Sequence, residues 1–351
     1  MSIMDSTVQS NRAPSLCSRC RVCLWWCGRA CHWLPVLVIL GIVSWSYYAY
    51  VIELCLVTLE NVVQVSIYLL VYHFLILMFL WSYWRTICSK AKPIPSKFKL
   101  PPSEIEKLLS AESEEAQRNI LEEFAKDLPV FTRTNSGAIR YCNRCVLVKP
   151  DRAHHCSICG QCVLKMDHHC PWVNNCVCYH NYKFFILFLG YAILYCVYIA
   201  ATTLPSFIVF WKGDLQTQSS SRYHIVFVFF VSLIFLISLT SLFVYHIYLV
   251  LKNRTTLEAF RAPMFRGGSD RNGFNLGAYN NFKEVFGNDP KLWFIPVFSS
   301  LGDGTVFPVR QEHRLQSFTM APEPHNYHSM GTTKSRSEHA TDQSERDQYL
   351  P

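Results

Sequence analysis

Cysteine and histidine gather at high density between Cys142 and Cys178, where the tripeptide His-His-Cys occurs twice. It occupies residues 154–156 and recurs fourteen residues later at 168–170. Thiolate and imidazole are ligands that zinc prefers in proteins, and a Cys-x2-Cys pair forms a natural two-sulfur half-site. The segment therefore predicts metal binding, and the question is whether one of these side chains is left free to react.

The fourteen-residue offset sorts the candidate ligands into two interleaved sets. Both sets have the pattern Cys-x2-Cys-x9-His-x6-Cys, so each offers three thiolates and one imidazole, which suits a structural zinc ion. The first set consists of Cys142, Cys145, His155 and Cys162, and the second consists of Cys156, Cys159, His169 and Cys176. The sequence thus predicts two structural Zn²⁺ ions.

A sequential grouping of the same residues is the alternative. It places the two Cys-x2-Cys pairs, Cys142/Cys145 and Cys156/Cys159, in one four-sulfur site. The second site then takes Cys162, a histidine, Cys170 and Cys176. We favour the interleaved sets, because the sequential ones have no internal symmetry and use Cys170 as a ligand.

The interleaved sets leave Cys170 without a metal, at the end of Asp167-His168-His169-Cys170. A free cysteine has a pKa of about 8.5, so at neutral pH it needs a base or a cationic neighbour to become a nucleophile. His168 can accept the thiol proton, and Asp167 can orient the imidazole and stabilise its charged form. We therefore predict that Cys170 is a catalytic nucleophile; a spare structural thiol is the alternative.

The composition indicates a membrane protein. Half of the 351 residues are hydrophobic and only 17% are charged, against about a quarter in soluble domains. Four apolar stretches, at 33–56, 62–84, 184–211 and 223–251, each exceed the roughly 20 residues that a helix needs to span a bilayer. We predict an α-helical polytopic membrane protein with four transmembrane helices and a cytosolic two-zinc cysteine-rich domain between the second and third.

Basic residues predict the orientation of these helices. Of the 33 Lys and Arg residues, only Lys212 and Arg222 lie between the third and fourth stretches, and none lies between the first and second. The positive-inside rule then places both termini and the cysteine cluster in the cytosol. In that reducing compartment metal binding or catalysis is favoured over disulfides. The net charge of +8 indicates contact with a lipid bilayer and gives no sign of nucleic-acid binding.

These features divide the chain into six segments. They are a cytosolic N-terminal segment (1–32), the first two helices (33–84), a cytosolic segment (85–183) with the zinc domain at 140–180, the last two helices (184–251), a cytosolic C-terminal region (252–310) and a disordered tail (311–351). In the third segment, Ser103-Glu-Ile-Glu106 resembles a capping box. It predicts an amphipathic helical stretch that runs to about Leu128.

The position of Cys170 favours an amphiphilic substrate. Trp172 follows at once, and the third apolar stretch begins shortly after, so the thiol is expected at the cytosolic membrane surface. A long-chain acyl-CoA has a reactive head and an apolar tail, and burying roughly fourteen methylenes yields about 11 kcal/mol at ~0.8 kcal/mol each. The candidates for contact with the anionic CoA head are Lys149, Arg152 and His154.

The segment Cys142–Cys176 resembles the cysteine-rich domain of the DHHC family of protein S-acyltransferases (palmitoyltransferases). Thr255-Thr-Leu-Glu258 resembles the TTxE motif of that family, and residues 272–287 resemble its C-terminal aromatic motif. Residues 45–50 and 301–304 are similar to the vertebrate subgroup numbered two, fifteen and twenty, which usually has glycine and serine where Cys178 and His180 stand here. The resemblance covers about residues 33–310.

This resemblance implies a ping-pong protein S-palmitoyltransferase. Cys170 would take an acyl group from palmitoyl-CoA or another long-chain acyl-CoA and pass it to a cytosolic cysteine of a membrane-associated protein. The family further implies an acyl cavity among the four helices, with Trp172 near its mouth and Ser46 and Tyr195 at its closed end, and support of Asp167 by Thr256. Residence in the Golgi or endoplasmic reticulum, recycling endosome or plasma membrane is implied as well.

Two other functions compete with acyl transfer. A catalytically inactive, zinc-stabilised membrane adaptor would use the same metal sites and leave Cys170 idle. Thiol-disulfide exchange is disfavoured, because Cys170 has no second cysteine in a Cys-x-x-Cys pair: Val173 stands at that position.

Overall fold

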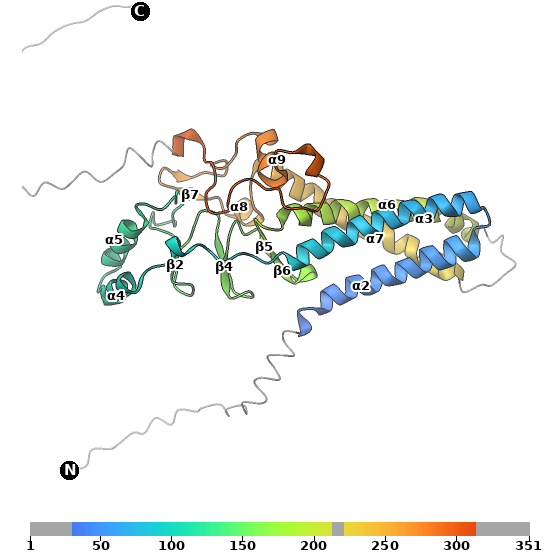
Figure 1. Cartoon of the computed structure of the whole chain (residues 1–351), viewed down its shortest axis with the longest axis horizontal. Helices are drawn as coiled ribbons and strands as arrows, with labels where there is room; N and C mark the ends of the chain where they lie inside the picture. The colour runs from blue at the N-terminus through green and yellow to red at the C-terminus, as the bar shows by residue number, and fades with distance from the viewer. Residues whose placement is uncertain (1–29, 213–220, 314–351) are drawn as a thin grey trace, which may run out of the picture.

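The structure is a computed structural model and describes residues 30–212 and 221–313 (Figure 1). The N-terminal segment up to residue 29 lies outside these ranges. So does the tail from residue 314, for which the sequence predicts disorder.

Four helices that are long and apolar enough to cross a membrane form one bundle (Figure 1). They are α2 (Leu34–Tyr47), which continues as a π-helix from Tyr48 to Thr58, α3 (Val62–Cys88), α6 (Tyr182–Trp211) and α7 (Ser221–Lys252). Helix α6 is the most enclosed of the four and packs against both α3 and α7. The predicted fold class, four membrane-crossing helices with a cysteine-rich domain between the second and third, is confirmed.

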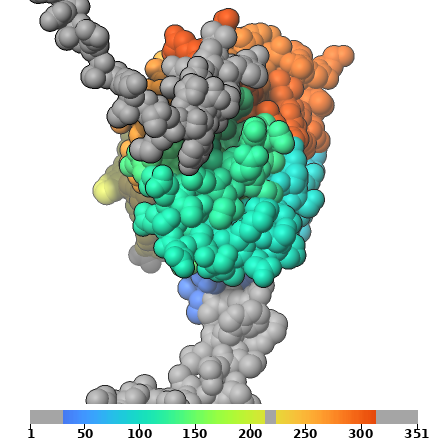
Figure 2. Space-filling model, turned by 90° about the vertical axis from the view of Figure 1, so that its left-hand side faces the viewer, coloured from blue at the N-terminus to red at the C-terminus, as the bar shows by residue number. Residues whose placement is uncertain are grey.

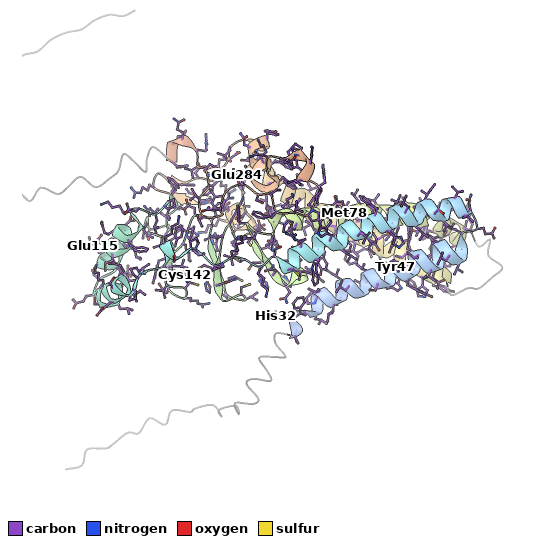
Figure 3. All side chains as sticks on the ribbon, in the orientation of Figure 1. His32, Tyr47, Met78, Glu115, Cys142 and Glu284 are labelled. Carbon is purple, nitrogen blue, oxygen red and sulfur yellow. The ribbon has the colours of Figure 1, made fainter. Side chains whose placement is uncertain are left out.

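The cysteine-rich segment lies beyond one end of the bundle. Figure 3 shows Cys142 between the spans, which carry Tyr47 and Met78, and the helix that carries Glu115. The segment consists of three antiparallel hairpins whose strands have two or three residues: β1 (Tyr141–Cys142) with β2 (Leu147–Val148), β3 (His154–Cys156) with β4 (Gln161–Val163), and β5 (His168–Cys170) with β6 (Asn175–Val177). Such short hairpins are not stable by themselves in water.

The helical stretch predicted from the Ser103 capping box to about Leu128 is present but is interrupted once. The chain forms two helices, α4 (Pro102–Ser110) and α5 (Glu114–Ala125), on the side of the cysteine-rich segment that faces away from the helix bundle (Figure 2). The predicted capping box at Ser103 is wrong, because Pro101 takes the N-cap position of α4 and no side chain caps that helix. Ser113, a preferred N-cap residue, begins α5 by accepting from the backbone N–H of Ala116.

The chain after α7 returns to the hairpins. It forms α8 (Thr256–Phe260), the β7–β8 hairpin (Met264–Phe265 with Gly268–Ser269) and α9 (Ala278–Phe286), which packs against α7. Helix α8 starts with a full capping box: the Thr255 hydroxyl accepts from the Glu258 N–H, and the Glu258 carboxylate accepts from the Thr255 N–H. The TTxE residues therefore define a rigid helix start.

A buried ion pair joins this helix start to the hairpins. Arg152 donates through Nε and Nη2 to the two carboxylate oxygens of Glu258, at 2.8 and 2.7 Å. The same guanidinium donates to the side chain and the backbone carbonyl of Asn253, at 2.8 and 2.9 Å. It also lies over the rings of Phe274 and Phe307. Both charged side chains are almost completely enclosed, so each charge depends on the other.

We expect Glu258→Gln to destabilise the protein strongly, because the substitution leaves the Arg152 cation buried without its anion. Breaking one side of a buried ion pair costs about 3–5 kcal/mol. The free energy of unfolding in detergent micelles measures this effect. A matched Arg152→Met/Glu258→Gln variant removes both charges and should recover much of the loss. A Glu258→Gln protein within about 0.5 kcal/mol of the parent, the range of neutral surface changes, would contradict the assigned role of the pair.

Candidate metal centres and active site

The three hairpins repeat one strand register at the fourteen-residue offset. In each hairpin the first strand ends on a cysteine, and that cysteine pairs with the residue five positions later: Cys142 with Leu147, Cys156 with Gln161, and Cys170 with Asn175. Cys170 therefore occupies in the third hairpin the position that Cys142 and Cys156 occupy in the first and second.

The turns of the hairpins repeat as well. The residue four positions after each of these cysteines has a left-handed backbone: Val146 at φ 52°, Gly160 at φ 68° and Asn174 at φ 46°. Glycine and asparagine adopt this conformation readily, whereas a β-branched valine does so only when its surroundings enforce it. The repeat is thus a property of the backbone and extends to the third hairpin.

Two clusters of cysteine and histidine atoms form between successive hairpins. In the first, Nδ1 of His155 lies 3.6, 3.3 and 3.8 Å from the sulfurs of Cys142, Cys145 and Cys162. In the second, Nδ1 of His169 lies 3.7, 3.5 and 3.6 Å from the sulfurs of Cys156, Cys159 and Cys176. Each cluster takes its cysteine pair from one hairpin and its cross-strand His/Cys pair, His155–Cys162 or His169–Cys176, from the next.

These clusters fit a tetrahedral metal ion. With Zn–S and Zn–N bonds of about 2.3 and 2.0–2.1 Å, tetrahedral geometry places the nitrogen about 3.6 Å from each sulfur. The measured separations scatter closely around that value, and three thiolates with one imidazole are an ordinary structural zinc shell. Within the part of the chain that the structure describes, the atoms gather as the interleaved sets and not as the sequential ones. Each set can therefore hold one metal ion.

The third hairpin has no such cluster, because Val173 replaces the second cysteine of its turn. The Cys170 side chain is buried at the end of the apolar core of the helix bundle. Two contacts fix the hairpin to α3: the Asn175 amide donates to the carbonyls of Thr86, Ile87 and Ser89, and the Tyr83 hydroxyl donates to the carbonyl of Trp172. The free thiol of Cys170 thus lies where the cysteine-rich segment meets the helix bundle.

A histidine and a buried carboxylate accompany this thiol. The Nδ1–H of His168 donates to Asp167 Oδ2 at 2.6 Å. Thr256, at the start of α8, donates to both carboxylate oxygens, through its backbone N–H at 2.9 Å and its hydroxyl at 2.7 Å. The structure thus brings together Asp167, His168, Cys170 and Thr256, the four residues that the sequence nominates for catalysis and its support.

The charged forms of Asp167 and His168 stabilise each other. Burial raises the pKa of a carboxyl group, yet the hydrogen bond and the charge of His168 outweigh burial and hold the pKa of Asp167 below its usual value. Burial lowers the pKa of His168, but its hydrogen bonds with Asp167 and Cys170 outweigh burial and raise that pKa to about 9. The imidazolium is therefore favoured beside Cys170, which suits a thiolate nucleophile.

His246 of α7 is a neighbour that the sequence analysis missed. One ring nitrogen of His246, one of His168 and one carboxylate oxygen of Asp167 all lie within 4.8 Å of one another. The 2.6 Å contact between His168 and Asp167 is shorter than the separation of about 3.3 Å between two nitrogen or oxygen ligands of one zinc ion, so these groups form a hydrogen-bonded cluster. The available signal was an ionisable residue within an apolar span.

All three predicted CoA contacts, Lys149, Arg152 and His154, line a basic cavity of about 400 Å³, together with Arg140 and Arg261. Burial, followed by the charge of Arg140, lowers the pKa of His154 to about 4, so its imidazole is neutral at physiological pH. Glu258 and Asn253 bind the guanidinium of Arg152.

An apolar cavity of about 100 Å³ lies among the four membrane-crossing helices. Its lining includes Ser46 of α2 and Tyr195 of α6, whose side-chain oxygens are 2.8 Å apart. The Tyr195 hydroxyl is also 2.7 Å from that of Tyr72, so three hydroxyl groups form a buried chain at this point. Trp172, by contrast, is half exposed in the turn after Cys170, which packs against α2 and α3.

Cys178 is not a second reactive thiol. Its side chain is fully buried below the second metal cluster, against Met166 and Cys176. Burial raises the pKa of Cys178 to about 11, so it stays protonated at physiological pH. His180, the other unusual residue here, is buried between aromatic rings, stacks on Phe298, and has no partner for its Nδ1 atom.

The fold and the site together define a class: a four-span membrane protein with a metal-cluster module that presents a cysteine–histidine–aspartate group to the end of its helix bundle. Residues 135–262 match the DHHC palmitoyltransferase family. The chain is 56% identical over 283 residues to palmitoyltransferase ZDHHC2 of Danio rerio, which covers 81% of this chain and 78% of the relative. It is 53% identical to ZDHHC15 of Xenopus laevis (85% and 88% covered) and 56% identical to ZDHHC20-A of Danio rerio (85% and 82%). The chain belongs to the DHHC palmitoyltransferase family, whose members are protein S-acyltransferases.

We expect Cys145→Ser to lose one metal ion and to fold poorly, because it removes a ligand from the first cluster. Cys170→Ser should keep both ions, because that thiol belongs to neither cluster. Metal analysis of the purified proteins measures the difference: two zinc ions per chain in the parent and in Cys170→Ser, and fewer in Cys145→Ser. One ion per chain in the parent, or loss of metal from Cys170→Ser, would contradict the interleaved sets.

Proposed function

We propose that this protein transfers a long-chain acyl group from acyl-CoA to its own Cys170 and then to cytosolic cysteines of membrane-associated proteins. The observation that supports this proposal most strongly is the third hairpin, which keeps the cysteine position of the first two hairpins but has Val173 in place of the second cysteine of a Cys-x2-Cys pair. Its thiol lies beside His168, Asp167 and Thr256 at the end of the helix bundle. A thiol held by a rigid backbone beside an imidazole is an activated nucleophile.

The acyl group is transferred in two steps. The Cys170 sulfur, whose proton His168 has taken, attacks the thioester carbonyl of acyl-CoA; the bond to the CoA sulfur breaks, and His168 returns the proton to the departing thiol. In the second step His168 takes the proton of a substrate cysteine. That sulfur attacks the carbonyl of the Cys170 thioester, the bond between the acyl carbon and the Cys170 sulfur breaks, and His168 returns the proton to the Cys170 sulfur. Asp167 keeps the imidazole oriented and stabilises its charge in both steps.

Each interleaved set would hold one structural zinc ion, and the ion of the second set would hold the backbone on both sides of Cys170. His169, the residue directly before it, belongs to the second set, and so does Cys176. Four protein ligands would complete each shell, as in other structural zinc sites. The ions would then supply folding energy, and the chemistry belongs to the side chains of the third hairpin.

The acyl chain occupies the cavity among the helices. Ser46 lies twelve residues into α2, so a rise of 1.5 Å per residue places it about 18 Å from the end that faces the hairpins. That depth is close to the hydrocarbon thickness of one leaflet, about 15 Å, which long acyl chains themselves form. The Ser46–Tyr195 pair is then the closed end of the cavity, and Trp172 lies near its mouth. Lys149 and the rim of the basic cavity bind the CoA phosphates.

This activity places the reacting groups in the cytosol, where acyl-CoA and substrate cysteines are found. The basic residues that flank the spans support that orientation. The membranes proposed are the Golgi or endoplasmic reticulum, recycling endosome and plasma membrane, and the protein substrates carry cysteines next to the bilayer. The relatives are named palmitoyltransferases, which supports palmitoyl-CoA as the donor.

We expect purified protein to acquire a hydroxylamine-sensitive label from labelled palmitoyl-CoA, because a thioester to Cys170 is cleaved by hydroxylamine. Cys170→Ala should acquire none. Cys178→Ala is the matched control, because that thiol is buried and protonated, and it should label like the parent. After removal of free palmitoyl-CoA, the label should move from Cys170 to an added peptide with a membrane-proximal cysteine.

Three outcomes would overturn the proposal. Absence of label in the parent would favour the inactive adaptor. Equal labelling of the parent and Cys170→Ala would place the chemistry at another residue. Label that forms on Cys170 but never moves to the peptide would defeat the two-step route.

We expect Tyr195→Ala to shift acyl preference toward longer chains, because it removes the ring and hydroxyl that close the cavity. Ser46→Phe should shift preference toward shorter chains by filling the same end. At ~0.8 kcal/mol per buried methylene, two methylenes can change the ratio of rates by up to about tenfold. Competition between myristoyl-, palmitoyl- and stearoyl-CoA for Cys170 measures the shift. Leu194→Ala, at an exposed neighbouring position of α6, is the control, and a preference unchanged in both cavity variants would contradict the assignment.

A further inference from the structure

His246 is buried in α7, at the end of the span that meets the hairpins, and its sequence neighbours are apolar or aromatic. An ionisable side chain inside an apolar span is costly to keep there and usually has a function. The ring contacts Phe185 and Tyr182 of α6, with centroids 5.0 and 5.9 Å away, and lies 5.8 Å from the ring of His168. It therefore lies directly behind the reacting group without belonging to the hairpins.

The Tyr182 hydroxyl and the Asp167 carboxylate together favour one tautomer of this ring. The Tyr182 hydroxyl and His246 Nδ1 are 3.1 Å apart, and when the proton is on Nε2 the phenol donates and Nδ1 accepts. One ring nitrogen of His246 lies within 4.8 Å of an Asp167 carboxylate oxygen and of a His168 nitrogen. Because Tyr182 engages Nδ1, we assign this nitrogen as Nε2. The opposite tautomer would turn a lone pair toward the Asp167 carboxylate, which is electrostatically unfavourable.

The Asp167 carboxylate has room for one more donor. It accepts three hydrogen bonds, one from His168 and two from Thr256. A carboxylate offers about four acceptor positions, and a buried carboxylate gains stability from each position that is filled.

We propose that His246 is a positioning residue of the acyl-transfer site, whose Nε2–H is directed toward Asp167 and, with Tyr182 behind it, holds the carboxylate in the orientation that aims His168 at Cys170. This inference rests on the proposed transfer through Cys170. The α7 helix then contributes twice to the site: through Thr256 just beyond its end and through His246 within it.

Three substitutions of His246 separate a donor from a space-filling side chain. His246→Gln keeps an N–H donor near the Nε2 position. His246→Asn ends one bond shorter, so it can still meet Tyr182 but cannot reach Asp167. His246→Met fills similar volume without any donor. The readouts are the maximal rate of Cys170 acylation, the palmitoyl-CoA concentration that gives half of that rate, and zinc per chain.

We expect His246→Asn and His246→Met to lower the maximal rate about 10- to 100-fold, the usual effect of losing a hydrogen bond to a charged group. The half-saturating concentration and the zinc content should stay unchanged, because the residue touches neither acyl-CoA nor metal. His246→Gln should remain within a few-fold of the parent. Rates near the parent value in all three variants would overturn the inference, and so would a loss in His246→Gln as large as in His246→Met.

Tyr182→Phe is the second test, for the case that the His246 variants do not fold. It removes the O–H that fixes the His246 ring and leaves the aromatic packing in place. A few-fold drop in maximal rate with two zinc ions retained supports the inference, and a parental rate overturns it. A parent protein that never acylates Cys170 would refute the proposed function itself, which is a distinct result.

Discussion

The buried ion pair between Arg152 and Glu258 is the interaction on which the site depends. The two residues lie on opposite sides of α6 and α7 in the sequence, and their charge-assisted hydrogen bonds join the hairpins to the chain after α7. Removing two charges from water costs several kcal/mol per ion. Here bidentate geometry, the contacts with Asn253 and two aromatic faces offset that cost. Because Glu258 also completes the capping box of α8, the pair fixes the helix start that presents Thr256 to Asp167.

The metal clusters and the helix bundle hold the hairpins in place. The hairpins are too short to bury a core, so two metal ions would join them in pairs and set the register of their turns. The third hairpin receives metal only through its cross-strand pair His169–Cys176, and its turn is held by Asn175 and Tyr83 against α3 instead. One substitution in the repeat, valine for cysteine at position 173, thereby separates a ligand position from a reactive one.

The sequence predicts what depends on local pattern. The fourteen-residue offset identifies both ligand sets, and uninterrupted apolar stretches identify the four spans within a few residues at each end. It fails where distant contacts decide the outcome. Arg152 reads as a surface cation because its partner lies 106 positions away, and His246 reads as part of a span because its neighbours come from other elements. The break between α4 and α5 is a local feature: Pro101 begins the first helix, and Ser113 caps the second.

The Cys170 thiol lies at the boundary between the hairpins and the helix bundle for a physical reason. An apolar environment is needed for the acyl chain, yet it disfavours a thiolate and an imidazolium. Cys170 resolves the conflict by position: its side chain ends the apolar core of the bundle, while His168 and Asp167 behind it belong to a hydrogen-bonded polar group. Such a polar group stabilises charge only if it cannot reorient. The backbone next to the second metal cluster, the α8 helix start and the ring of His246 all adjoin this group, and together they leave it little freedom to reorient.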